Sequence, residues 1–246
     1  MRAVAHATPQ LIAPGLVIES GEIRMLTQEN RADVERYFQK HLPPTGSVRL
    51  LTFASKKERV SCVYCEDVKQ LAEELAELSR GRVSAEHHWV EDSPELVERL
   101  KVRQTPATVV TNGESSLALK FYGLPGGYEF TALLEDIVDA MGGPSRLGSD
   151  TVAALQNLAA PARIQVFVTP TCPYCPRAVR MAHQFSLSNP TMIDAEMVES
   201  MEFPELANQY SVMAVPKIVV NDRIQFEGAL PESDFLEQVL EAARSA

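Results

Sequence analysis

All four cysteines of the 246-residue chain occur in two Cys-x-x-Cys pairs. The first pair is Cys62 and Cys65, and the second is Cys172 and Cys175. Residues three apart on a helix share a face, so such a pair at a helix start brings two sulfur atoms within bonding distance. This spacing serves either dithiol–disulfide exchange or metal binding, and the surrounding residues must decide between the two.

Each cysteine pair is expected to stand between a buried strand and a helix. The first pair follows an apolar run at residues 48–53, and the second follows a similar run. After each pair the apolar residues recur with the period of a helix. A helix N-terminus stabilises a thiolate through its exposed N–H groups and partial positive charge. We therefore predict Cys62 and Cys172 as nucleophiles, and Cys65 and Cys175 as the residues that resolve the mixed disulfide.

The chain repeats itself with a constant offset around the cysteines. Four pairs of matching residues are each 110 positions apart: Cys62 and Cys172, Pro94 and Pro204, Val102 and Val212, Pro106 and Pro216. A repeat of this length indicates a duplicated domain rather than a solenoid unit. With Gly142-Gly143-Pro144-Ser145 as the boundary, we expect an N-terminal tail (1–20), a first unit (21–143) and a second unit (144–246).

Two prolines are the second candidate feature of the sites. Pro106 and Pro216 each lie 44 residues after the first cysteine of their pair and lead an apolar strand. A cis proline at this place would lay its ring beside the dithiol. The preceding residue, Thr105 or Val215, would then offer backbone hydrogen bonds to an extended substrate strand.

These residues carry a resemblance to a known family. A strand, a Cys-x-x-Cys at a helix start and a later proline before a hairpin resemble the thioredoxin fold, and Cys172-Pro173-Tyr174-Cys175 has the glutaredoxin form of the motif. Two such units resemble the glutaredoxin-like protein disulfide oxidoreductases of thermophilic archaea and bacteria. The stretches most similar to that family are residues 121–125, 135–139, 169–175, 179–183 and 212–217. The resemblance runs from about Gly21 to the C-terminus.

The resemblance implies both a fold and an activity. The fold class would be α/β, with two tandem thioredoxin-like folds, each a central mixed β-sheet flanked by helices. The activity would be dithiol–disulfide exchange on protein substrates, covering reduction, oxidation and isomerisation. Electrons would come from a thioredoxin-reductase-like flavoprotein. The redox-active groups would be the disulfides Cys62–Cys65 and Cys172–Cys175, with no other cofactor and no metal.

Two alternatives remain at this stage. The four cysteines could hold zinc in a non-catalytic scaffold, although 106 residues separate the pairs, far more than in a short zinc ribbon. The chain could instead be a glutathione-dependent glutaredoxin. The glutathione site of ordinary glutaredoxins has a Gly-Gly and an Asp after the proline-led strand, whereas this chain reads Glu227-Gly228-Ala229-Leu230 there.

The two dithiols have different neighbours. Glu66 and Asp67 follow the first pair and oppose a thiolate, whereas Arg177 follows the second pair and could either favour a thiolate or point into solvent. Lys56, Lys57 and Arg59 precede the first pair and could offset its acids. We expect the second pair to be the more oxidising. Tyr64 and Tyr174, each just before the second cysteine, are candidates for a substrate platform.

Composition excludes several classes of protein. With 45% hydrophobic residues the chain can build a sizeable core, and a net charge of −10 argues against a broad nucleic-acid surface. No segment has the apolar length of a secretory signal or a membrane span, so we expect no membrane partner and a cytoplasmic location. In that compartment cysteine pairs are more often catalytic or metal-binding than structural. Glu73, Glu74 and Glu77 are expected on a solvated helix face.

Overall fold

The computed structural model describes residues 17–19, 22–58, 62–113, 116–143 and 145–244. Three features named in the sequence analysis lie outside these residues: most of the N-terminal tail, Arg59, and Pro144 in the predicted domain boundary. The strands are β1 (Val17–Glu19), β2 (Glu22–Arg24), β3 (Val48–Ala54), β4 (Val83–Trp89), β5 (Ala107–Thr111), β6 (Leu119–Tyr122), β7 (Ala162–Val168), β8 (Ile193–Glu199), β9 (Lys217–Val220) and β10 (Ile224–Glu227). The helices are α1 (Gln28–His41), α2 (Cys65–Leu78), α3 (Pro94–Leu100), α4 (Glu129–Ala140), α5 (Ser149–Gln156), α6 (Cys175–Ser188), α7 (Pro204–Gln209) and α8 (Glu232–Arg244).

The repeat in the sequence gives two halves with the same strand layout. In the first half β3 pairs in parallel with β4 and antiparallel with β5, which pairs antiparallel with β6. In the second half β7 pairs in parallel with β8 and antiparallel with β9, which pairs antiparallel with β10. The α/β class and the two tandem thioredoxin-like folds predicted from the sequence are thus confirmed.

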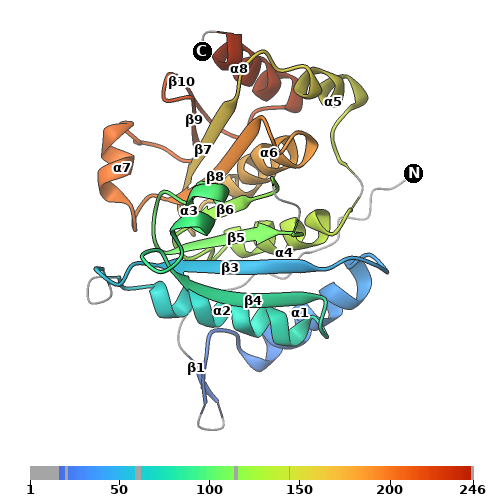
Figure 1. The fold of residues 1–246 in the computed structure, drawn as a ribbon, viewed down its shortest axis with the longest axis vertical. Coiled ribbons are helices and arrows are strands. Elements are labelled where there is room, and N and C mark those ends of the chain that lie inside the picture. The colour runs from blue at the N-terminus through green and yellow to red at the C-terminus, as the bar shows by residue number, and fades with distance from the viewer. Residues whose placement is uncertain (1–16, 20–21, 59–61, 114–115, 144, 245–246) are drawn as a thin grey trace.

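The two halves share one sheet. Strand β6 of the first half pairs in parallel with β8 of the second, which gives eight strands in the order β10-β9-β7-β8-β6-β5-β3-β4 (Figure 1). The sequence indicated two separate central sheets and contains no direct signal for this junction. A short hairpin of β1 and β2 precedes the sheet, and its first strand falls inside the predicted tail.

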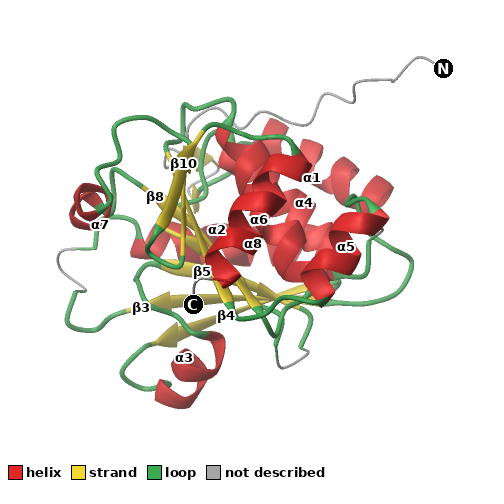
Figure 2. Cartoon of the chain, turned by 90° about the horizontal axis from the view of Figure 1, so that it is seen from above, coloured by secondary structure: helices red, strands yellow, loops and turns green. Residues whose placement is uncertain are grey.

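Helices cover the two faces of this sheet unequally. The larger apolar core gathers side chains of α1, α2, α4, α5, α6 and α8 on one face. The smaller core gathers side chains of α3 and α7 on the other face (Figure 2). Both cores contain residues of both halves, such as Phe121 with Val166 in the larger and Phe53 with Phe167 in the smaller. Shared burial therefore joins the two halves in addition to the strand pairing.

Local signals explain where several helices begin. Thr27 caps α1, because its hydroxyl accepts a hydrogen bond from the Asn30 backbone N–H at 3.2 Å. Proline stands in the first turn of α3, α6 and α7, where its missing N–H costs no helical bond. Among the described residues, no helix combines the length and the apolar character needed to cross a membrane.

The prediction that Glu74 lies on a solvated helix face is wrong. Its side chain is buried in α2 and accepts hydrogen bonds from the backbone N–H groups of Met25 and Leu26 at 2.6 and 3.3 Å. It also pairs with Arg31 of α1 at 2.9 Å. The segment before α1 covers this side of α2, and the helical period of α2 alone cannot show that.

Candidate active site at two dithiols

Cys62 and Cys65 form the first disulfide at the start of α2. Their Cα atoms are 5.7 Å apart, and Cys65 is the first residue of the helix. The Cys62 backbone N–H donates to the Glu58 carbonyl at 2.7 Å. Both cysteines are partly exposed, and Val63 between them is 78% exposed. The first dithiol is therefore open to a macromolecular partner.

Cys172 and Cys175 form the second disulfide at the start of α6. Their Cα atoms are 5.5 Å apart, and Cys175 is the first residue of this helix. Both cysteines are buried, with Cys172 7% exposed and Cys175 fully enclosed. Tyr174 between them is 69% exposed. At this site the tyrosine between the cysteines is therefore more accessible than the cysteines themselves.

The two prolines singled out in the sequence lead the strands beside these disulfides. The peptide bonds Thr105–Pro106 and Val215–Pro216 are both cis. In the second half the Sγ of Cys172 lies 3.6 Å from the carbonyl oxygen of Val215. The structure thus brings each dithiol and its proline loop to the same end of the sheet. Roles for these loop residues in substrate binding remain a prediction.

A cleft of about 1200 Å³ opens at the first disulfide and lies between the two halves. The first half lines it with residues around the dithiol and its proline loop, and the second half lines it with the loop after β8 and with α7. The lining residues are Ser55, Glu58, Cys62, Val63, Tyr64, Val90, Val97, Val102, Arg103, Gln104, Thr105, Pro106, Leu124, Gly126, Pro170, Glu199, Met201, Glu202, Phe203, Pro204, Glu205, Leu206 and Gln209. None of the second-site residues Cys172, Tyr174, Cys175, Val215 and Pro216 is among them.

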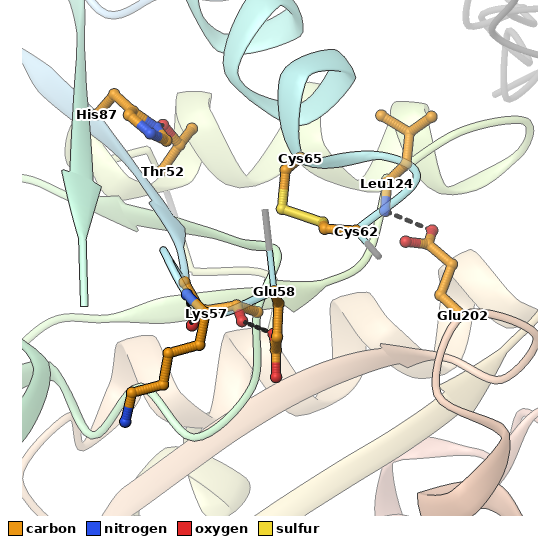
Figure 3. The surroundings of a disulfide bond; sticks show 10 residues. Thr52, Lys57, Glu58, Cys62, Cys65, His87, Leu124 and Glu202 are labelled. Atoms are coloured by element: carbon orange, nitrogen blue, oxygen red, sulfur yellow. Dashed lines mark hydrogen bonds between the residues drawn. A yellow bond between two sulfur atoms is a disulfide. The ribbon is translucent and has the colours of Figure 1, made fainter. Parts of the chain in front are cut away.

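Glu202 brings a carboxyl group from the second half to the first dithiol. Its side chain points toward the Cys62–Cys65 disulfide and accepts a hydrogen bond from the Leu124 N–H at 2.7 Å (Figure 3). Burial raises the pKa of Glu202 to about 7 despite this bond, and the carboxylates of Glu199 and Asp67 add to the rise. Burial also raises the pKa of Asp67 itself. The first dithiol therefore faces the carboxyl group of Glu202, which titrates near neutral pH.

Glu129, at the first position of α4, is a second carboxyl that sequence reasoning missed. It is 1% exposed, and neither oxygen has a hydrogen-bond partner among the described residues. Burial raises its pKa well above the usual range. The preceding residue, Tyr128, donates its N–H to the Pro170 carbonyl at 3.1 Å, two positions before Cys172. Glu129 thus lies in the segment of the first half that packs on the loop of the second dithiol.

The sequence partly indicates Glu202 as a residue near the first dithiol, but it contains no signal that singles out Glu129. The 110-residue offset matches Glu202 with Asp92, so the repeat places an acid in the same loop of both halves. Asp92 pairs with Lys56 at 2.6 Å within its own half. Glu202 instead reaches across the junction of β6 and β8, so its proximity to Cys62 follows from the joined sheet.

The alternative of a four-cysteine zinc site is not supported. Within the described parts of the chain, no group of three or more Cys, His, Asp or Glu side chains is placed to hold a metal ion. The cysteines instead form two separate pairs in different halves. His87 and His88 alternate along β4, where His87 contacts Thr52 at 3.0 Å and His88 stacks on Phe53.

Comparison with known proteins agrees with this architecture. A thioredoxin domain family model matches residues 59–135 and 162–241, together more than half of the chain. A protein disulfide oxidoreductase from Aeropyrum pernix has a similar structure, with a TM-score of 0.80, 30% sequence identity and coverage of 94% of this chain and 96% of that chain.

Two further relatives match at the level of sequence. A thioredoxin from Methanocaldococcus jannaschii is 35% identical over 77 residues, 31% of this chain and 91% of that protein. An NADH dehydrogenase from Ferdinandcohnia aciditolerans is 24% identical over 190 residues, or 77% of this chain. The match spans only 33% of the length of that dehydrogenase.

The fold and the two dithiols define a thioredoxin-fold oxidoreductase. The chain belongs to the thioredoxin domain family, in which each of its halves is one domain match. Its activity is dithiol–disulfide exchange, in agreement with the two disulfide pairs that the structure contains.

Proposed function

We propose that the chain is a protein disulfide oxidoreductase whose two dithiols both exchange with disulfides of protein substrates. The observation that carries this proposal is the pairing, in each half, of an oxidisable Cys-x-x-Cys at a helix start with a cis-proline loop. Residues exposed at both sites suit a macromolecular partner, because Val63 and Tyr174 present apolar surface directly between the cysteines.

In the reductive direction the chemistry runs in two exchange steps. The thiolate of Cys62 or Cys172 attacks one sulfur of the substrate disulfide, forms a mixed disulfide and releases the other sulfur as a thiolate. Cys65 or Cys175 then attacks the mixed disulfide, which frees the second substrate thiol. Two electrons have passed to the substrate, and the protein pair is left oxidised. The same steps in reverse oxidise a substrate dithiol.

The residues that precede the cis prolines would hold the substrate during attack. In the second half the Val215 carbonyl already lies 3.6 Å from the nucleophile Cys172, so a substrate strand alongside it would bring its sulfur to that of Cys172. Thr105, which precedes the other cis proline, lines the cleft together with Cys62. Tyr64 and Tyr174, which are 38% and 69% exposed, would form the outer edge of each site.

A separate reductase would return the protein to its dithiol form. Similarity to part of an NADH dehydrogenase supports a flavoprotein of the thioredoxin-reductase type, fed by a nicotinamide nucleotide. The sequence at Glu227-Gly228-Ala229-Leu230 differs from the glutathione site of glutaredoxins, which favours such an enzyme over glutathione as reductant.

Trapping of mixed disulfides tests this function. In Cys65→Ser and Cys175→Ser variants the nucleophile remains and the resolving thiol is absent, so a disulfide-containing protein such as insulin should accumulate as a covalent adduct. Cys62→Ser and Cys172→Ser should each abolish the adduct at their own site. Adducts would be resolved by non-reducing electrophoresis and mass spectrometry. A protein that gives no adduct from either site, and no dithiothreitol-driven reduction of insulin, would contradict the proposal.

A further inference from the structure

Exposed apolar side chains line the cleft at the first dithiol. Among the described residues, six large hydrophobic side chains are exposed, and three of them line this cleft: Val63, Tyr64 and Met201. Met201, which is 76% exposed, comes from the second half and lines the same cleft as Val63 and Tyr64. Apolar groups on two walls of one cleft mark a surface that a partner covers.

The wall from the second half is acidic. Glu199, Glu202 and Glu205 line it within seven residues of one another. Glu205 is exposed at the first turn of α7, and Glu202 points toward the disulfide (Figure 3). Arg103 is the one basic side chain lining the cleft among the described residues, and its guanidinium pairs with Asp194 at 2.8 Å and also with Glu196. Its charge is therefore already matched.

Neighbouring lysines do not reverse this charge. Lys56 precedes the dithiol, but it pairs with Asp92 at 2.6 Å and is not among the cleft-lining residues. The side chain of Lys57 extends away from the Cys62–Cys65 disulfide (Figure 3). A partner that enters the cleft along α7 would therefore meet carboxylates before it reaches Cys62.

We propose that this cleft binds an extended polypeptide with basic side chains next to its cysteine, and that Glu202 and Glu205 of the second half thereby select substrates for the first dithiol. The inference rests on the proposed function, since it names the substrate class of one of the two sites. The cleft has a volume of about 1200 Å³, above the range of about 300 to 1000 Å³ that is usual for small-molecule pockets. A cleft of this size suits a polypeptide segment better than a small disulfide compound. Cys172 and Cys175 of the second dithiol are not among the residues that line the cleft.

Paired peptide disulfides test the preference. A Cys172→Ser/Cys175→Ser protein, which keeps the first dithiol alone, would be reduced, freed of reductant and mixed with one of two disulfide peptides at pH 8. The peptides are identical except for two lysines or two glutamates beside the cysteine. We expect the lysine peptide to be cleaved about tenfold faster at low salt, with the ratio falling as ionic strength rises.

Matched variants test whether the cleft causes the faster cleavage of the lysine peptide. A Glu202→Gln/Glu205→Gln protein should lose most of this preference for the lysine peptide. Glu237→Gln, at an exposed position on α8, should retain it. The second dithiol, tested in a Cys62→Ser/Cys65→Ser protein, should cleave both peptides at similar rates.

Three outcomes would overturn the inference. Equal rates for the two peptides, or a ratio unchanged by the double glutamine variant, would reject the selection while leaving the proposed function intact. Failure of the first dithiol to cleave either peptide would reject the proposed function at this site, and the inference with it.

Discussion

At the scale of single residues, Glu129 is a carboxyl group that the fold buries without a partner among the described residues. Burial raises its pKa, so the native protein keeps Glu129 protonated where the unfolded chain ionises it. The native state then binds more protons than the unfolded state, and stability falls as pH rises above about 4.5, the ordinary pKa of a glutamate.

Glu129→Gln should remove this dependence, because the amide is isosteric and does not ionise. Relative to the unsubstituted protein, the variant should gain stability as pH rises from 4 to 8, with a slope of at most about 1.4 kcal/mol per pH unit. Urea unfolding of both proteins across this range measures the difference, and the other titrating groups cancel in it. If the difference in unfolding free energy between the two proteins does not vary with pH, Glu129 is ionised in the folded protein.

The reduction potentials of the two dithiols provide a second prediction at this scale. Carboxyls gather at the first pair, through Asp67 of α2 and Glu202 of the second half. Negative charge opposes the thiolate and so disfavours the reduced form of this pair. We expect the second pair to be the more oxidising, by about 30 mV, which corresponds to roughly 1.4 kcal/mol. Single-site proteins equilibrated with a glutathione or dithiothreitol buffer would give the two potentials.

Glu202→Gln isolates the electrostatic cause of that difference. Loss of this carboxyl should raise the reduction potential of the first pair and so reduce the difference in potential between the two dithiols. The change should be clearest above pH 7, where Glu202 is ionised. Glu237→Gln provides the control for net charge. Equal potentials in the two single-site proteins, or the reverse order, would be inconsistent with the prediction.

At the scale of elements, charged networks connect the halves on both faces of the sheet. On one face Arg180 of α6 pairs with Glu135, Asp136 and Asp139 of α4. On the other face Glu196 of β8 is fully buried and pairs with Arg103 and Arg163. The arginines of both networks therefore compensate the charge of carboxylates that lie buried or partly buried in the fold.

Arg180→Leu should destabilise the protein by about 3 to 5 kcal/mol, because three carboxylates would lose their shared cation. Arg177→Leu, an exposed position on the same helix, should change stability by less than about 0.5 kcal/mol. Denaturant unfolding of both variants measures the two effects. A loss below about 1 kcal/mol in Arg180→Leu would mean that the carboxylates are protonated or reach other partners.

The strands and helices within each half could be predicted from the sequence. The way in which the two halves join could not. Apolar runs and helical periods located β3, α2 and α6 because local burial dictates those patterns. Strand β8 alternates Asp194 and Glu196 with apolar residues, the pattern of a strand with one solvated face. In the structure Lys120 of β6 pairs with Asp194 and lies opposite Glu196, so the polar face is buried. Charge pairing between distant segments leaves no periodic signal.

The same limit applies to the candidate sites. The cysteines and prolines were recognisable because spacing and repetition lie within one half. The acidic wall of the cleft comes from the other half, and it approaches Cys62 only because β6 pairs with β8. The stretches 135–139 and 179–183 were noted only for family resemblance, and the structure shows that they contact each other through Arg180.

At the scale of the whole molecule, the joined sheet and shared cores suggest that the halves fold together. We propose units 21–143 and 144–246 as structural halves of one cooperative domain. The larger core runs through both halves, from Val34 of α1 to Val239 of α8. Cooperative unfolding is the expectation when one hydrophobic core spans the elements concerned.

The single tryptophan makes this testable, because Trp89 lies in β4 of the first half. Phe235→Leu, in the buried face of α8, should destabilise the protein by about 1 to 2 kcal/mol. If the halves unfold together, the Trp89 fluorescence midpoint in urea should shift as far as the circular dichroism midpoint does. Met213→Ala, at a side chain that is 90% exposed, should shift neither midpoint.

Independent unfolding of the halves would give a different result. The Trp89 fluorescence midpoint of Phe235→Leu would then stay unchanged while its circular dichroism curve became biphasic. In that case the cleft at Cys62 would open whenever the second half unfolds.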